Sequence, residues 1–246
     1  MLRSPLGRGS RPSDPDSANK VLLYAVLTAV ILVLVALGYL VYAVVVRPSV
    51  PRTSLERQVL ALERIVKVQP ANGKAWADYA GALIEAGRFS NADQAISEGL
   101  RMSERKAPVL VQRARLEQLR GRDDEALKTA AEAIKEAKGA RDRGMAEARK
   151  KGLTAPPASS PEIVAAELLR AEIQTKRGRL EEAIGSYTIA LEESPMLADV
   201  LALRGSAYAK LGKNAAARAD FLASLKYDPE NKDAHKGLDA LGEAKQ

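Results

Sequence analysis

Few residues of this sequence have side chains suited to catalysis. His235 is the only histidine among 246 residues, and there is no cysteine. A transition-metal site, a cysteine nucleophile or a histidine-based dyad therefore cannot be assembled. The carboxylates are numerous but dispersed at spacings typical of helix surfaces, and no glycine-rich phosphate loop follows a strand pattern. We predict no catalytic residue, no metal site and no cofactor, and hence a protein that is not an enzyme.

Small residues recur along the chain in a fixed register. Glycines at positions 87, 121, 178 and 212 are separated by steps of 34, 57 and 34 residues. The long step equals one 34-residue period plus an insertion of 23 residues, so the sequence predicts four copies of one unit. Three further columns keep these steps: Ala92, Ala126, Ala183 and Ala217; Ala80, Ala114, Ala171 and Gly205; and Leu100, Ile134, Leu191 and Leu225.

The stretch "LALRGSAYAKLGKNAAARADFLASLKYDPEN", from Leu201 to Asn231, shows one copy most clearly. Its small residues allow two helices to approach closely, and its central glycine suits a left-handed turn between them. The spacing and these residues resemble the tetratricopeptide repeat (TPR) family. The resemblance implies an all-α solenoid of helix hairpins, whose stacking buries apolar faces and leaves a concave groove.

The predicted organisation places this solenoid between capping helices. The copies lie near 73–106, 107–138, 164–197 and 198–231, with the insertion at 139–163, so that the repeat domain covers 73–231. A juxtamembrane spacer and an N-terminal capping helix occupy 47–72, where Thr53 and Glu56 are spaced for a capping box. Residues 232–246 are expected to form a C-terminal capping helix.

An apolar segment precedes the repeats. Residues 21–46 contain no charge, and 26 helical residues reach about 39 Å against a bilayer core of roughly 30 Å. The alternative, a cleaved signal peptide, has a shorter apolar region. We predict a single-pass integral membrane protein whose anchor helix contacts lipid, with residues 1–20 forming a disordered, basic, cytoplasmic tail. Because a tail with four cations resists translocation, we expect the repeat domain to be extracytoplasmic.

The resemblance implies that function lies in the groove formed by the first helix of each copy. Carrying over the family's groove positions gives a mixed surface with central charges. The residues predicted to bind a partner protein there are Arg115, Gln118, Glu172, Lys176 and Lys210. The lysine and asparagine that clamp a C-terminal carboxylate in chaperone-binding members are replaced here, which disfavours that partner.

The 23-residue insertion carries many cations. It is predicted to continue the second helix of copy two, followed by a loop and by an N-cap at Ser160 before Pro161. Its basic residues form either a solvated arm or a docking surface for a protein or for anionic lipid. Glu117 and Gln174 stand where the family prefers tyrosine, so we expect looser hairpins there.

A net charge of +7 is compatible with nucleic acid or anionic lipid. The short "GRGSR" tail lacks interleaved aromatic residues, so we predict no nucleic-acid partner. The favoured function is a non-catalytic, membrane-tethered scaffold that assists assembly or maturation of a membrane or envelope complex. The alternatives are a structural subunit of a large membrane complex and a cytochrome c maturation-type factor that holds an apoprotein. Two further alternatives are an organelle import receptor and a lipid-binding protein.

Overall fold

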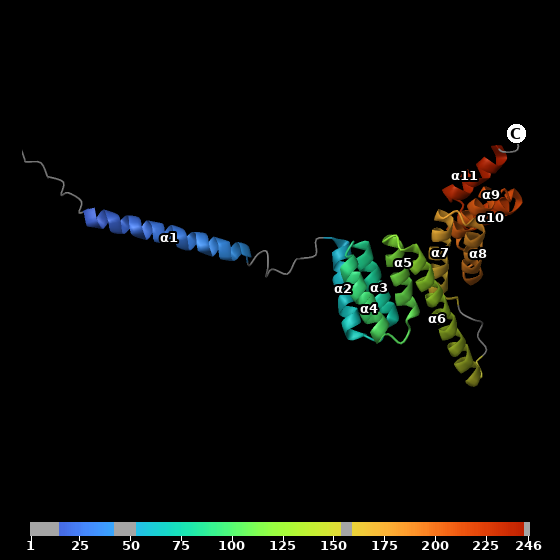
Figure 1. Cartoon of the computed structure of the whole chain (residues 1–246), viewed down its shortest axis with the longest axis horizontal. Helices are drawn as coiled ribbons and strands as arrows, with labels where there is room; N and C mark the ends of the chain where they lie inside the picture. Colours follow the sequence, from blue (N-terminus) through green and yellow to red (C-terminus); the bar gives the residue numbers. More distant parts are fainter. Residues whose placement is uncertain (1–14, 42–52, 154–158, 244–246) are drawn as a thin grey trace, which may run out of the picture. The chain divides into compact units, whose positions relative to one another are not determined.

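The computed structural model describes residues 15–41, 53–153 and 159–243 (Figure 1). The chain divides into two units, Met1–Arg52 and Thr53–Gln246. All the regular structure in the described residues is α-helical. The predicted tail, at residues 1–20, lies mostly outside these ranges.

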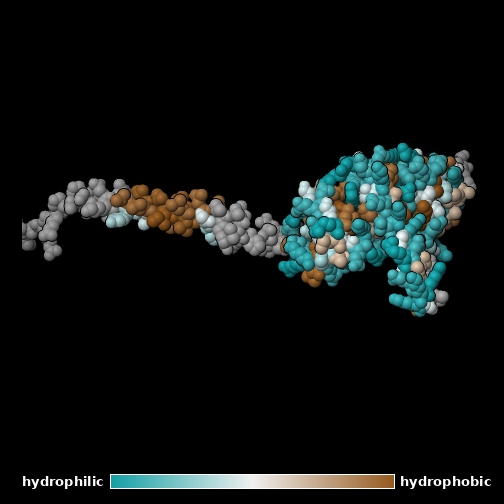
Figure 2. Space-filling model, turned by 60° about the horizontal axis from the view of Figure 1, so that its bottom comes forward, coloured by the Kyte–Doolittle hydropathy of each residue, from teal (hydrophilic) through white to brown (hydrophobic). Residues whose placement is uncertain are grey.

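The described part of unit 1 is the helix α1 (Pro15–Val41), and most of its described apolar side chains are exposed (Figure 2). The prediction of a membrane-spanning helix over 21–46, and with it an integral membrane location, is wrong. None of the helices in the described ranges combines the length and apolarity that crossing a membrane requires. The helix also differs from the predicted segment, because it starts within polar sequence that includes Asp16 and Lys20, and it ends at Val41. Residues 42–46 lie outside the described part of the chain.

Unit 2 consists of helices that pack with their neighbours in sequence. The hairpins are α3/α4, α5/α6, α7/α8 and α9/α10, with α2 packed on α3, and with α11 packed on α9 and α10. The bounds are α2 Ser54–Val68, α3 Gly73–Glu85, α4 Phe89–Met102, α5 Ala107–Leu119, α6 Asp123–Lys150, α7 Pro161–Lys176, α8 Leu180–Glu193, α9 Ala198–Lys210, α10 Asn214–Tyr227 and α11 Lys232–Glu243.

The local signals at the first helix of unit 2 are confirmed. Thr53 is the N-cap of α2, and its hydroxyl accepts a hydrogen bond from the Glu56 backbone N–H at 3.1 Å. The Glu56 carboxylate in turn accepts one from the Thr53 N–H at 3.3 Å. This reciprocal pair satisfies two N–H groups that a helix start otherwise leaves without partners.

The recurring small residues have two different roles. Gly87, Gly121, Gly178 and Gly212 all have a positive φ, between 68° and 73°, and each follows the first helix of a hairpin. Gly205 instead lies at a close approach, because a β-carbon there would lie 2.9 Å from a ring carbon of Phe221 and 3.2 Å from the carbonyl oxygen of Ala217. The alanines of the other columns are fully buried, as close helix packing requires.

Two hairpins have polar pairs at the position where the family prefers tyrosine. Buried Glu117 on α5 accepts a hydrogen bond from the Thr129 hydroxyl of α6 at 2.7 Å. One copy later, buried Gln174 on α7 accepts one from the Ser186 hydroxyl of α8 at 3.2 Å. Side-chain hydrogen bonds thus connect the two helices of each of these hairpins at the position where a tyrosine ring would otherwise pack.

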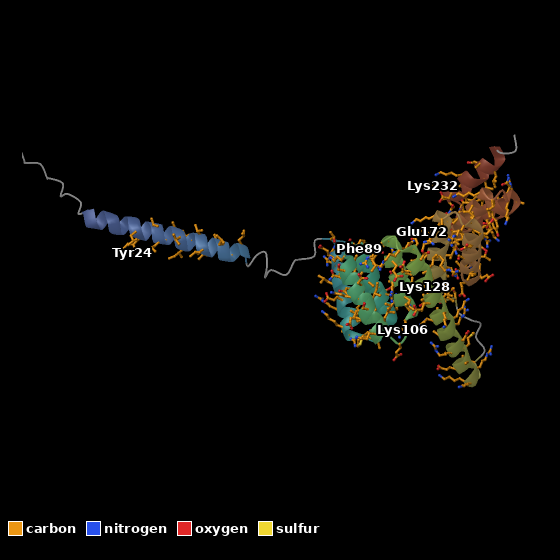
Figure 3. The ribbon with its side chains drawn as sticks, in the orientation of Figure 1. Tyr24, Phe89, Lys106, Lys128, Glu172 and Lys232 are labelled. Carbon is orange, nitrogen blue, oxygen red and sulfur yellow. The ribbon has the colours of Figure 1, made fainter. Side chains whose placement is uncertain are left out.

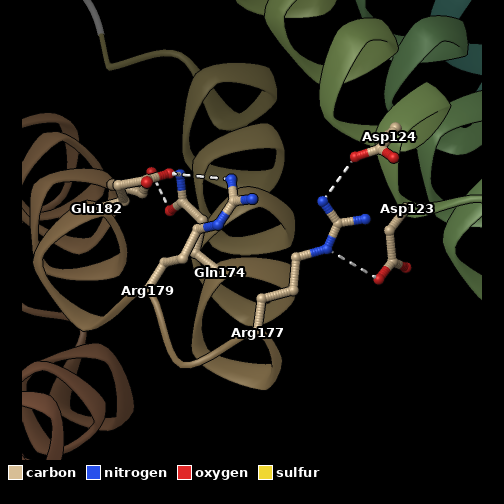
Figure 4. Close-up of polar contacts among 7 residues, drawn as sticks. Asp123, Asp124, Gln174, Arg177, Arg179 and Glu182 are labelled. Carbon is tan, nitrogen blue, oxygen red and sulfur yellow. Dashed lines mark hydrogen bonds and ion pairs between the residues drawn. The ribbon is translucent and has the colours of Figure 1, made fainter.

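Ion pairs connect successive hairpins. Arg120, directly after α5, contacts Asp93 on α4 at 2.6 Å. Arg177, directly after α7, contacts Asp124 at 2.6 Å and Asp123 at 3.5 Å, both at the start of α6 (Figure 4). The hydrogen bond from Arg177 lowers the pKa of Asp124. Each arginine thus reaches back to the preceding copy and links two neighbouring hairpins.

Helix α6 extends beyond α5 and α7, so the predicted helical continuation into the insertion is present (Figure 1). Its cations at 138, 143 and 149–151 are exposed or only partly buried, whereas Arg141 contacts Glu193 of α8 at 2.7 Å. The other Glu193 oxygen accepts a hydrogen bond from the Ser160 backbone N–H at 3.0 Å. Ser160 is the N-cap residue before Pro161, as predicted, but its hydroxyl donates to Glu162 rather than capping α7.

Candidate functional site

A groove of about 850 Å³ lies along the first helices of the second, third and fourth hairpins. Helices α5, α7 and α9 supply most of its lining, and α7 reaches it with residues from both halves of its length. The residues are Val111, Gln112, Arg115, Gln118, Ala165, Leu168, Leu169, Glu172, Thr175, Lys176, Tyr187, Met196, Leu197, Ala198, Asp199, Val200, Leu203 and Asp228.

Much of the groove surface is apolar and open to solvent. Met196, in the loop before α9, is 71% exposed, and Leu203 on α9 is 45% exposed. Partly buried Leu168 of α7 lines the groove as well. Apolar side chains clustered in a concavity mark a binding surface more often than scattered exposed ones do.

The α5 and α7 side of the groove is bordered by paired charges. Arg115 on α5 lies 3.9 Å from the Glu85 carboxylate of α3. Lys176 lies 3.3 Å from Glu172 one turn earlier on α7, where Figure 3 labels Glu172. Both pairs are largely exposed, and such pairs contribute only about 0–1 kcal/mol each. A ligand can therefore displace these contacts at small cost.

The α9 side is acidic. Asp199, in the first turn of α9, accepts a hydrogen bond from the Asn231 side-chain amide at 2.8 Å. Asp228, directly after α10, accepts one from the Glu230 backbone N–H at 3.1 Å. Among the described residues, no lysine or arginine forms an ion pair with either carboxylate. These two groups are thus the groove charges without an ionic partner in the described structure.

Two amide groups on α5 have unused hydrogen-bonding capacity. The Gln112 Oε1 and Gln118 Nε2 atoms are shielded from solvent, and neither has a partner within the described residues. An unsatisfied buried polar atom costs about 1–3 kcal/mol, so rotation of either amide toward a ligand would be favourable. The α5 side therefore offers polar contacts beside the apolar surface.

Tyr187 of α8 lines the groove and is buried. Burial raises the pKa of its hydroxyl, and the nearby Glu172 carboxylate adds to this effect, while the neighbouring Thr175 opposes it. The net direction is upward, so Tyr187 stays neutral near pH 7 and adds no charge to the groove.

Four of the five residues predicted from the sequence, Arg115, Gln118, Glu172 and Lys176, line this groove. Lys210, near the end of α9, does not. Met196, Leu203 and Asp228 also line the groove but are not among the residues predicted from the sequence. Met196 and Asp228 lie outside the first helices, and Leu203 is outside the family's groove positions, so a search of those positions could not find them.

A second cavity of about 360 Å³ lies between α4 and α5 and is lined by Asp93, Arg113, Glu117, Arg120 and other residues. Two of its three arginines, Arg113 and Arg120, are already paired, with Glu117 at 3.0 Å and with Asp93 at 2.6 Å. The described residues also contain no group of three or more His, Asp or Glu side chains that could hold a metal ion. The larger groove is thus the better candidate for a binding site.

Comparisons with known proteins agree with this architecture. Residues 198–231 match the family model described as tetratricopeptide repeat. The fold is similar to that of BtubC from P. vanneervenii, with a TM-score of 0.56 and 20% identity over 78% of this chain and 84% of that chain. It is similar to MamA, with a TM-score of 0.50 and 13% identity over 70% of this chain and 87% of that one.

A tetratricopeptide repeat protein from Parabacteroides merdae ATCC 43184 is also similar, with a TM-score of 0.50 and 18% identity over 74% of this chain and 59% of that chain. No curated protein matches the sequence. These identities show the fold alone. Together with the match at 198–231 they support the tetratricopeptide repeat family, whose members in general mediate protein–protein interactions. The all-α, TPR-like solenoid is therefore confirmed, without the predicted membrane helix.

Proposed function

We propose that this protein is a non-catalytic scaffold that binds a segment of a partner protein in the α5–α7–α9 groove. The observation that carries the proposal is the concentration of exposed apolar side chains, Met196 and Leu203 foremost, inside a concavity bordered by charged groups. Burying such side chains on binding is favourable by about 25 cal/mol per Å² of apolar surface. Arg115, Gln118, Glu172 and Lys176 would then orient the bound segment.

A groove of this kind suits a segment that is exposed in one state of the partner and covered in another. Of the functions expected from the sequence, assistance in assembly or maturation of a protein complex fits best. Such a scaffold would release its client once the segment is buried in the finished complex. A permanent subunit of a complex is the alternative, and it would keep its partner at fixed stoichiometry.

The test is copurification of partners with the tagged full-length protein, compared between wild type and Leu203→Asp. Leu222→Asp is the matched control, because Leu222 on α10 is also an exposed leucine, at 54%, but does not line the groove. We expect the groove variant to lose the partners and the control to keep them. Equal recovery from both variants would contradict the proposal. Partners present at less than equimolar amount would favour the assembly function over the permanent subunit.

A further inference from the structure

The acidic side of the groove is held in place by a buried residue. Asn231 is 6% exposed, and its side-chain amide N–H group donates to Asp199 at 2.8 Å. Its side-chain oxygen accepts from the Ala234 backbone N–H at 3.0 Å and so caps α11. Because both ends of the amide are engaged, the Asp199 carboxylate has a fixed orientation before any ligand arrives.

The same residue fixes the position of Asp228. The Asn231 backbone N–H donates to the Asp228 carbonyl oxygen at 3.1 Å, and the Asp228 N–H donates to the Ser224 carbonyl oxygen at 2.9 Å. Asp199 and Asp228 are thus both anchored to the turn between α10 and α11, on one side of the groove. Two carboxylates on the same side of the groove both favour a cation placed near them.

Arg204, on the same helix as Asp199, is already engaged elsewhere. Arg204 on α9 donates to both oxygens of Asp220 at 2.8 Å, and to Thr188 at 3.1 Å. The groove cations Arg115 and Lys176 come from α5 and α7 and are paired with Glu85 of α3 and with Glu172 of α7. A basic side chain of the ligand would therefore supply the ionic partner that Asp199 and Asp228 lack among the described residues.

We infer that the groove selects a segment in which apolar residues are flanked by a single lysine or arginine. This inference rests on the function proposed above and specifies the chemistry of the partner. The apolar side chains would cover Leu168, Met196 and Leu203, and the basic side chain would lie against Asp199 and Asp228. Asp199 and Asp228 have no ionic partner among the described residues. Contact of the one basic side chain with them would therefore fix the register of the bound segment.

The same groove disfavours a polybasic segment. Arg115 and Lys176 lie on the α5 and α7 side and are already paired with Glu85 and Glu172, so additional cations on the ligand would have to compete with them for these carboxylates. The protein as a whole also carries a formal charge of +7, which slows the approach of strongly basic ligands. A single basic residue gains the local attraction of the two carboxylates without these costs.

The experiment is selection of a random peptide display library on immobilised full-length protein, with counter-selection on Leu203→Asp. Affinities of the selected peptides are then measured by fluorescence anisotropy. They are compared between wild type, the double variant Asp199→Asn/Asp228→Asn, and Asp233→Asn as control. Asparagine keeps a side-chain oxygen for Asn231 and Glu230, and circular dichroism checks that the fold is retained. Asp233 is an exposed aspartate of α11 that does not line the groove.

We expect selected peptides with apolar residues and one lysine or arginine, whose affinity falls roughly fivefold to tenfold in the double variant. Replacing the peptide lysine by norleucine should weaken binding to wild type and not to the double variant. Enriched apolar peptides without a basic preference, or an unchanged affinity of the double variant, would overturn this inference and leave the proposed function standing. No enrichment over Leu203→Asp would overturn the proposed function itself.

Discussion

Lys176 and Lys210 occupy the same position in successive hairpins, 34 residues apart, yet only Lys176 lines the groove. Lys176 is the last residue of α7, which lines the groove from Ala165 onward. Helix α9 lines the groove only with its first half, as far as Leu203. The two lysines are therefore a matched pair that separates a groove effect from a general charge effect.

The first prediction uses this pair. Lys176→Glu should let the groove accept peptides with two or more basic residues, because it removes the cation that engages Glu172 and adds a second carboxylate. Their affinity should rise severalfold, as measured by fluorescence anisotropy on the full-length protein. Lys210→Glu makes the same change of net charge outside the groove and should have little effect. An equal gain from both variants would mean that overall charge, and not the groove, controls binding.

The second prediction concerns the close approach at Gly205. Gly205→Ala places a β-carbon 2.9 Å from the Phe221 ring, and overpacking of this kind costs about 1–3 kcal/mol. Gly185→Ala is the control, because no neighbouring side chain or other helix lies within 4 Å of the position that an alanine β-carbon would take on α8. Alanine should stabilise that helix by up to about 1 kcal/mol. Thermal unfolding followed by circular dichroism should therefore shift in opposite directions, and equal shifts would contradict the packing argument.

The third prediction concerns Glu117, whose carboxylate is buried and accepts from Thr129 and Arg113. Glu117→Ala removes the acceptor for both donors and should destabilise the fold by about 2 kcal/mol. Thr129→Val keeps the shape of the threonine and removes one hydrogen bond. A double-mutant cycle in urea should give a coupling energy of about 1 kcal/mol between the two residues. Additive effects would show that the hairpin does not depend on this bond.

The fourth prediction concerns acid stability at the base of the α6 extension. Burial tends to raise the pKa of Glu193, but hydrogen bonds from the Ser160 N–H and Arg141 outweigh it and hold the pKa below its usual value. A carboxyl group with a lowered pKa in the folded state stabilises the fold above its unfolded pKa of about 4.3. That stabilisation is lost as the pH falls through the lower folded pKa.

Glu193→Gln should consequently be less stable than wild type at neutral pH, and the difference should shrink as both are acidified. Urea unfolding at neutral and at strongly acidic pH measures it. Glu192→Gln changes the neighbouring, exposed carboxylate and is the control. A difference between wild type and Glu193→Gln that does not depend on pH would contradict the assigned ionic contact.

The repeat architecture could be predicted because each copy solves the same packing problem with the same residue types. A left-handed turn needs glycine, and a close helix contact needs alanine or glycine, so both leave marks at a fixed period. Glu172 and Lys176, the groove residues predicted for copy three, both line the groove. Local rules of this kind act within one hairpin and are readable from sequence.

Properties that depend on several hairpins were not readable in this way. The groove extends over α5, α7 and α9 and includes no residue of α3, and its acidic side contains Asp228, which follows a second helix. Both features depend on how hairpins stack around the insertion, which no single period encodes. The apolar composition of residues 21–46 likewise predicts a helix with those bounds, whereas α1 begins in the polar sequence before them.

The most direct measurement is photo-crosslinking with a benzophenone amino acid placed in the full-length protein at Met196 or at Leu222. Both side chains are well exposed, but only Met196 lies in the groove. The account predicts that peptides selected for binding, carrying apolar residues beside one basic residue, crosslink efficiently from position 196 and not from position 222. Crosslinking of equal yield from both positions, or from position 222 alone, would contradict a binding site in the α5–α7–α9 groove.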